Sequence, residues 1–163
     1  MPAPDGTIAQ PLSPQEREAL LGIAQGRTTA ETAGDMGVSE STVKTYIQRI
    51  GGKLGSLERA AMVELAYQQH HLGVPEPVSQ RVYLPVEQRS VLEGLASGKT
   101  VEQIAADEHR PLADVRKDAR RMLRALGAST AAHAVTRGWQ LGLLGPAAGS
   151  DASRDIAALA GQA

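Results

Sequence analysis

The protein has 163 residues, and its 17 Lys and Arg side chains nearly balance its 18 Asp and Glu side chains, so the formal net charge is −1. Cysteine is absent, which excludes a disulfide framework and any thiolate-ligated metal site. With no Phe, one Trp and three Tyr, the core must consist of aliphatic side chains and alanine. The sequence has neither a membrane-spanning apolar run nor the features of a signal peptide, so we expect a cytoplasmic protein with no membrane partner.

The first predicted elements are two short helices, each introduced by a capping signal. Residues 1–11 are rich in Pro and Ala, and we expect them to form a flexible N-terminus. Ser13-Pro14-Gln15-Glu16 combines a capping box with proline at the first helical position, which predicts a helix that stops at Gly26. Thr28-Thr29-Ala30-Glu31 is a second capping box and predicts a short helix that ends near Met36-Gly37.

The third predicted helix, capped by Ser39, has one apolar stripe and one polar face. Its apolar side chains follow the spacing i, i+4, i+7, i+11 and are Val43, Ile47, Ile50 and Leu54. When this stripe packs inward, the outward side chains are hydrogen-bonding groups suited to phosphates and base edges, namely Ser41, Lys44, Thr45 and Gln48. Gly51-Gly52 costs roughly 1 kcal/mol per glycine inside a helix, so we expect this helix to fray or to end early.

A fourth helix and a linker follow. The helix is expected over about 57–71, starting at Ser56 or Leu57 and ending near Leu72-Gly73. Residues 74–83 then contain two prolines and a serine, which mark a short Pro-containing linker. The length of this linker allows the segments on either side to lie close together or apart.

The sequence after the linker repeats the sequence before it. A shift of 72 residues aligns residues 12–73, the first half, with residues 84–145, the second half, and gives 18 identities in 62 positions without a gap. An internal duplication explains this agreement better than coincidence, and it predicts four further helices, the last over about 130–144. The capping box also recurs in the second half, as Thr100-Val101-Glu102-Gln103. The remaining residues, 146–163, are rich in Ala and Gly, and we expect them to form a flexible C-terminal tail.

Positive charge is concentrated in the second half. Residues 12–74 have six basic and seven acidic side chains, whereas residues 81–145 have ten basic and seven acidic ones. The third helix of the second half keeps the apolar stripe, as Val115, Ala119, Met122 and Leu126. Its outward side chains are all cations, namely Arg116, Lys117, Arg120 and Arg124. A local basic stripe matters more for phosphate binding than the total charge does.

Several spaced segments of the first half agree in order with one known family. They are Leu12–Glu18, Ala24–Gly26, Val38–Thr45 and Lys53–Gly55. Together they closely resemble the LuxR-type (GerE-like) helix-turn-helix DNA-binding domain, over Leu12 to about Leu72. The fold class that follows is all-α, with two tandem four-helix helix-turn-helix domains joined by the linker, the second a divergent copy.

The resemblance also implies roles for individual residues. The side chains that would face bases are Lys44, Thr45 and Gln48. The side chains that would contact the DNA backbone are Ser41, Thr42 and Lys53. The fourth helix would be the dimerisation surface. In the second half the corresponding DNA-binding candidates are Arg116, Lys117, Arg120 and Arg124, and they are the weaker set because residues 109–114 and Asp118 depart from the family pattern.

The sequence therefore predicts a sequence-specific transcriptional regulator that binds double-stranded DNA and has no room for a sensory domain. Duplication would replace dimerisation, so that the fourth helices pack within one chain as a pseudo-dimer; a homodimer through these helices is the other arrangement. Trp139, at the repeat position of Tyr67, is expected to pack in the core or between the halves. No catalytic residue, cofactor or metal site is expected.

Two other functions stay open. One is a weakly selective architectural binder of the nucleoid, which the cation-only face of the second half favours. The other is a protein-interaction module that partners a sigma factor or RNA polymerase and whose DNA-binding faces are vestigial. Competition against random DNA separates the first from a regulator, because a regulator prefers its site by at least about 10³.

Overall fold

The structure is a computed structural model that describes residues 10–146 and 148. This part of the chain has eight helices and no strand, which confirms the all-α prediction. The helices are α1 (Pro14–Ala24), α2 (Thr29–Met36), α3 (Glu40–Leu54), α4 (Arg59–Gln68), α5 (Val86–Ala96), α6 (Val101–Glu108), α7 (Leu112–Leu126) and α8 (Ala131–Gln140). Each of α5–α8 begins and ends 72 residues after its counterpart in α1–α4. Most of the two predicted flexible ends, 1–11 and 146–163, lies outside the described residues.

The predicted capping signals all form. At the start of α1 the Glu16 amide donates to Ser13 Oγ over 3.1 Å, and the Ser13 amide donates to Glu16 Oε1 over 2.9 Å. The same reciprocal pair joins Thr28 and Glu31 at α2, and it joins Thr100 and Gln103 at α6. These boxes satisfy backbone N–H groups that have no partner within their helix.

The fourth helices are shorter than predicted. α4 begins at Arg59 and ends at Gln68, and α8 covers Ala131–Gln140, in place of 57–71 and 130–144. After α4 the backbone enters the left-handed region at His70, with φ 61°, and after α8 it does so at Gly142, with φ 73°. This turn folds the following amides back onto the last carbonyls of the helix, which ends it.

The prediction that the third helix frays or ends early at Gly51-Gly52 is wrong, because α3 continues to Leu54. Gly51 is buried, and a Cβ there would lie 2.9 Å from the carbonyl oxygen of Ser56. The absence of a side chain at this position therefore lets the α3–α4 turn pack closely on α3. Gly52 faces open space.

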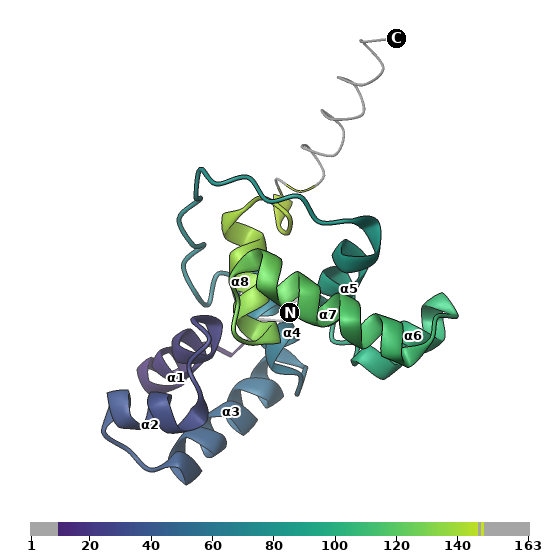
Figure 1. Ribbon diagram of the computed structural model, residues 1–163. Helices are drawn as coiled ribbons and strands as arrows, with labels where there is room; N and C mark the ends of the chain where they lie inside the picture. The colour runs from purple at the N-terminus through teal and green to yellow at the C-terminus, as the bar shows by residue number, and fades with distance from the viewer. Residues whose placement is uncertain (1–9, 147, 149–163) are drawn as a thin grey trace, which may run out of the picture.

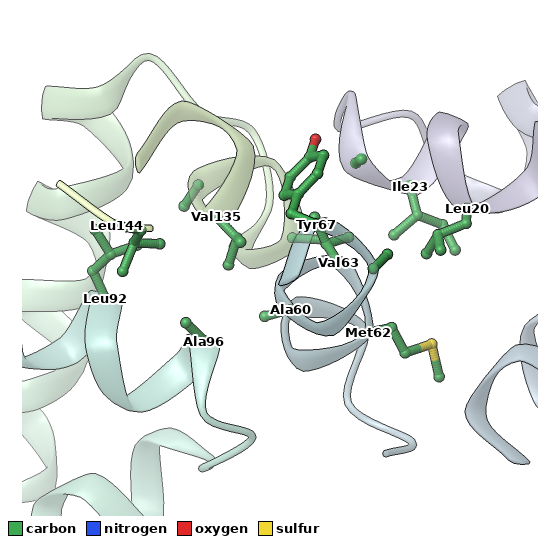
Figure 2. Packing of buried hydrophobic residues seen from close by; sticks show 14 of the residues in the cluster. Leu20, Ile23, Ala60, Met62, Val63, Tyr67, Leu92, Ala96, Val135 and Leu144 are labelled. Carbon is green, nitrogen blue, oxygen red and sulfur yellow. The ribbon is translucent and has the colours of Figure 1, made fainter. Parts of the chain in front are cut away.

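The two halves pack against each other, chiefly through α4 and α8 (Figure 1). In Figure 1 the purple and blue helices of the first half meet the teal to yellow helices of the second half at these two elements. Figure 2 shows Val63 of α4 between the Leu20 and Ile23 side of α1 and the Val135 side of α8. The buried apolar side chains of both halves form one continuous cluster. The linker therefore connects segments that are close, and the Val78 amide of this linker donates to the Gln140 carbonyl over 3.0 Å.

The contacts between the halves are reciprocal. The Tyr67 hydroxyl hydrogen-bonds Thr136 Oγ1 over 2.8 Å, and Trp139 Nε1 donates to Glu64 Oε1 over 2.6 Å. With the shift of 72 residues, Tyr67 corresponds to Trp139 and Glu64 corresponds to Thr136, so both hydrogen bonds join the same two positions. Of the two places expected for Trp139, the core or the contact between the halves, the structure shows the second, against Tyr67.

The helices α1 and α5 make the same kind of reciprocal contact. Gly26, after α1, lies against His133 of α8, and Gly98, after α5, lies against Ala61 of α4. Gly26 and Gly98 are 72 residues apart, and so are Ala61 and His133. No helix in the described chain is both long enough and apolar enough to cross a membrane.

Candidate nucleic-acid interface

A tight turn sets α3 across α2. The turn begins at Gly37, whose φ of 68° lies in the left-handed region, and the Val38 amide then donates to the Ala33 carbonyl over 3.0 Å. Ser39 follows as the N-cap of α3, with its Oγ accepting from the Thr42 amide over 3.2 Å. Two helices joined by a turn of this length, with a third helix supporting them, have the geometry of a helix-turn-helix unit.

The predicted inner and outer faces of α3 are observed. The four side chains of the apolar stripe are buried, namely Val43, Ile47, Ile50 and Leu54. Four of the predicted DNA-binding side chains are exposed on the opposite face, namely Ser41, Lys44, Thr45 and Gln48. Thr42 is half-buried, and its hydroxyl hydrogen-bonds Ser39 Oγ over 2.9 Å. Thr45 Oγ1 donates to the Ser41 carbonyl over 3.0 Å, which fixes the rotamer of this side chain.

Lys53 stands apart from the other predicted DNA-binding side chains because it is occupied within the protein. Its ammonium group lies 2.6 Å from Glu16 Oε1 and donates to the Pro11 carbonyl over 3.2 Å. Glu16 is a buried carboxylate; burial raises its pKa, but the hydrogen bonds from Lys53 and the Ser13 amide outweigh this and lower it. Lys53 therefore joins the end of α3 to the start of α1.

The helix α7 presents a more basic face than α3 does. Val115, Met122 and Leu126 are buried, and Ala119 is half-buried, so the predicted inward stripe is observed. The four predicted cations are all exposed on the outer face, namely Arg116, Lys117, Arg120 and Arg124. The turn before α7 has His109 at φ 53° where the first half has Gly37, and the N-cap Pro111 makes no side-chain capping hydrogen bond.

Asp118 does not reduce the positive charge of this outer face. Its side chain is buried on the inner side of α7 and makes an ion pair with Arg110 of the preceding turn. Arg110 also lies 3.6 Å from Glu108, which accepts a 2.6 Å hydrogen bond from Ser90 Oγ of α5. Sequence reasoning noted Asp118 as a departure from the family but missed this network, because nothing in the local spacing links residues 90, 108, 110 and 118.

One outer cation of α7 has an acidic neighbour. Arg116 Nη2 lies 3.2 Å from Glu102 Oε1 of α6, and both side chains are more than half exposed. The corresponding residues of the first half are Lys44 and Ala30, so the first half has no carboxylate at this place. Within the described residues, no group of three His, Asp or Glu side chains is arranged to hold a metal ion.

The geometry of α1–α4 and a comparison with known families together identify the domain in the first half. Residues 10–66, which contain α1–α3 and most of α4, match the family described as "Bacterial regulatory proteins, luxR family". This part of the chain is therefore one LuxR-type helix-turn-helix domain, as the sequence motifs predicted.

Two curated proteins are similar to part of the chain. The chain is 45% identical over 65 residues to the "Probable transcriptional regulatory protein NarL" of Mycobacterium tuberculosis, covering 40% of this chain and 30% of that protein. It is 41% identical over 56 residues to the "Probable HTH-type transcriptional regulator GfsR" of Streptomyces halstedii, covering 34% of this chain and 23% of that protein. The matched region thus spans less than a third of either relative. No solved structure matches the chain significantly.

Proposed function

We propose that the protein is a sequence-specific DNA-binding transcriptional regulator whose two halves act as an intramolecular pseudo-dimer. The LuxR-type domain of residues 10–66 supports DNA binding by α3. The observation that carries the pseudo-dimer is the reciprocal packing of α4 on α8, in which Tyr67 bonds Thr136 and Trp139 bonds Glu64.

The reciprocity is the property expected of a two-fold dimer interface. In an isologous interface, position i of one subunit contacts position j of the other, and position j of the first contacts position i of the second. The two halves satisfy this rule: Tyr67 contacts Thr136, which is equivalent to Glu64, and Trp139, which is equivalent to Tyr67, contacts Glu64. This pattern and the matching helix bounds are explained if the second half is a diverged copy of the first half and packs against it.

In this arrangement the helices α3 and α7 are the two recognition helices. Dimeric helix-turn-helix proteins place their recognition helices in successive major grooves, about 34 Å apart. The exposed mixed face of α3 supplies donors and acceptors for base edges, mainly through Lys44, Thr45 and Gln48. The face of α7 supplies four cations, so its target half-site differs from that of α3.

A selection from random double-stranded DNA, followed by sequencing of the bound pool, tests this proposal. We expect one motif with two unlike halves whose centres are separated by about one helical turn. Analytical ultracentrifugation of the complex should give one protein chain per site. Two chains on a palindrome of the α3 half-site would contradict the pseudo-dimer, and no binding at moderate salt would contradict DNA binding and direct the search to a protein partner such as a sigma factor or RNA polymerase.

A weakly selective DNA binder is the second candidate. The observation that favours it is the outer face of α7, where the cations remain exposed while Asp118 is buried beside Arg110. If all four cations met phosphates, this face would bind DNA without reading sequence. Bound DNA without an enriched motif, and a preference for any site below about 10³ over random DNA, would support this candidate over a regulator.

A further inference from the structure

At one pair of equivalent positions, α3 and α7 have cations in different surroundings. Lys44 of α3 and Arg116 of α7 are equivalent, and both are exposed on the outer face. Arg116 is hydrogen-bonded to Glu102 of α6, whereas Lys44 faces a helix with Ala30 at the equivalent place. The ion pair in the second half therefore has no counterpart in the first.

Glu102 is held in a defined place. It belongs to the first turn of α6, whose capping box between Thr100 and Gln103 fixes that turn. A hydrogen bond from its own backbone amide, and then one from Arg116, lower the pKa of Glu102, so the carboxylate is charged at neutral pH. α6 packs directly on α7, so the carboxylate and the guanidinium are carried by two elements in contact.

The guanidinium of Arg116 is hydrogen-bonded to Glu102 through only one of its nitrogen atoms. A guanidinium has five N–H donors in a planar fork, and Glu102 accepts from Nη2 only. The remaining donors are free to meet a pair of acceptors. In the major groove, guanine presents such a pair at O6 and N7, and arginine bound to both is the commonest base-specific contact.

We propose that Glu102 is a specificity-determining residue, which positions Arg116 to read a guanine and disfavours a phosphate at the same place. This inference rests on the proposed function, because it requires α7 to enter a major groove. The carboxylate repels a phosphate but tolerates a base edge, so the Arg116–Glu102 pair reads sequence. The neighbouring cations Lys117, Arg120 and Arg124 supply the contacts to phosphates.

The test compares variants of the full-length chain on a DNA site from the selection described above and on the same site with each α7 half-site guanine replaced in turn. For the wild type we expect one guanine whose replacement weakens binding about tenfold. Arg116→Ala should abolish that preference. Glu102→Ala should reduce it to threefold or less while strengthening binding to random DNA. Glu102→Gln, which keeps an acceptor for Arg116 but no charge, should restore most of the guanine preference.

The matched control is Glu93→Ala on α5. Glu93 is also an exposed acid paired with an arginine, Arg89, so the variant makes the same change in net charge without removing the partner of Arg116. It should leave the guanine preference unchanged. A guanine preference that persists in Arg116→Ala or in Glu102→Ala would overturn the inference, and the proposed function would stand because a two-part site had been selected. If the wild type selects no half-site for α7, the pseudo-dimer proposal fails and the inference fails with it.

Discussion

Tyr67 and Trp139, which are equivalent positions of the two halves, lie side by side with their ring centroids 5.4 Å apart and their planes at 51°. A residue that contacts its own equivalent must lie next to the axis that relates the two halves. Tyr67 hydrogen-bonds Thr136, and Trp139 hydrogen-bonds Glu64. Thr136 and Glu64 are themselves equivalent positions of the two halves. The contact between α4 and α8 is therefore centred on two aromatic side chains and their two polar partners.

The buried hydrogen bond between Tyr67 and Thr136 should show strong coupling in unfolding measurements. Tyr67→Phe or Thr136→Val leaves one buried hydroxyl without a partner, and each should reduce the free energy of unfolding by about 1–3 kcal/mol. The double variant should cost little more than one single variant, because both polar groups are then gone. Urea unfolding of the four proteins measures this. Tyr46→Phe, at a half-buried tyrosine of α3, is the control; strictly additive costs would show that the hydrogen bond contributes nothing.

The adjacent glycines of α3 should respond in opposite directions to alanine. Gly52→Ala adds a methyl group in open space within a helix, so it should raise the free energy of unfolding by about 0.5–1 kcal/mol. Gly51→Ala places its methyl group 2.9 Å from the Ser56 carbonyl oxygen and should lower stability by about 1–3 kcal/mol. Thermal unfolding distinguishes the two, and a stabilised Gly51→Ala variant would contradict the close packing of the α3–α4 turn.

Two histidines in the left-handed region should be improved by glycine. His70 ends the turn after α4 and His109 ends α6, whereas the equivalent residues of the other half are Gly142 and Gly37. Because side chains other than glycine strain this conformation, His70→Gly and His109→Gly should each stabilise the protein by about 0.5–1 kcal/mol after the entropy cost of glycine. The reciprocal changes, Gly142→His and Gly37→His, should destabilise it. Chemical denaturation checks all four, and stabilisation by either reciprocal change would count against this explanation.

Mild acid should weaken the contact between the halves. Burial, and then the nearby charge of Arg137, lower the pKa of His133, which lies on α8 against Gly26 of the first half. The unfolded chain, with a histidine pKa of about 6.5, then binds more protons than the folded chain, so stability is complete above that pH and falls as the pH drops through it. Burial, and then Arg17, also lower the pKa of His71, with the same sign. Unfolding at pH 7.5 and 5.5 should show the loss, and His133→Gln should make it smaller; an undiminished loss in that variant would assign it elsewhere.

The salt dependence of DNA binding should separate cations that reach DNA from those that serve the fold. Log K falls with log salt concentration at a slope of about −0.9 per neutralised phosphate. Arg120→Ala with Arg124→Ala, two cations assigned to phosphates, should flatten this slope by roughly one to two units if α7 touches the backbone. Lys53→Ala should change it less and should instead reduce stability, because Lys53 neutralises the buried carboxylate of Glu16. Titrations of labelled DNA at several salt concentrations measure the slopes, and an unchanged slope in the double variant would place α7 away from the DNA.

Much of the fold could be predicted because its signals are local. Capping boxes at Ser13, Thr28 and Thr100, together with the apolar period of α3 and α7, indicated five of the eight helix positions within a few residues. The predicted ends of α4 and α8 were too late. The backbone enters the left-handed region at His70 after α4 and at Gly142 after α8, and a histidine such as His70 does not look like a stop signal in the sequence. The effect of Gly51-Gly52 was predicted wrongly because helix propensity includes only the backbone cost of glycine. In the structure, close packing at Gly51 leaves no space for a Cβ atom.

Three properties could be predicted from the residues alone: that the chain is helical, that its two halves share one 72-residue pattern, and which side chains of α3 and α7 face outward. Local capping, helical period and residue type carry that information. The tertiary structure was needed to show which residues of α4 and α8 meet, that Lys53 neutralises Glu16, that Asp118 is buried with Arg110, and that Glu102 meets Arg116. These are contacts between residues distant along the chain or on different helices, and their existence depends on how the helices cross, which no local pattern specifies.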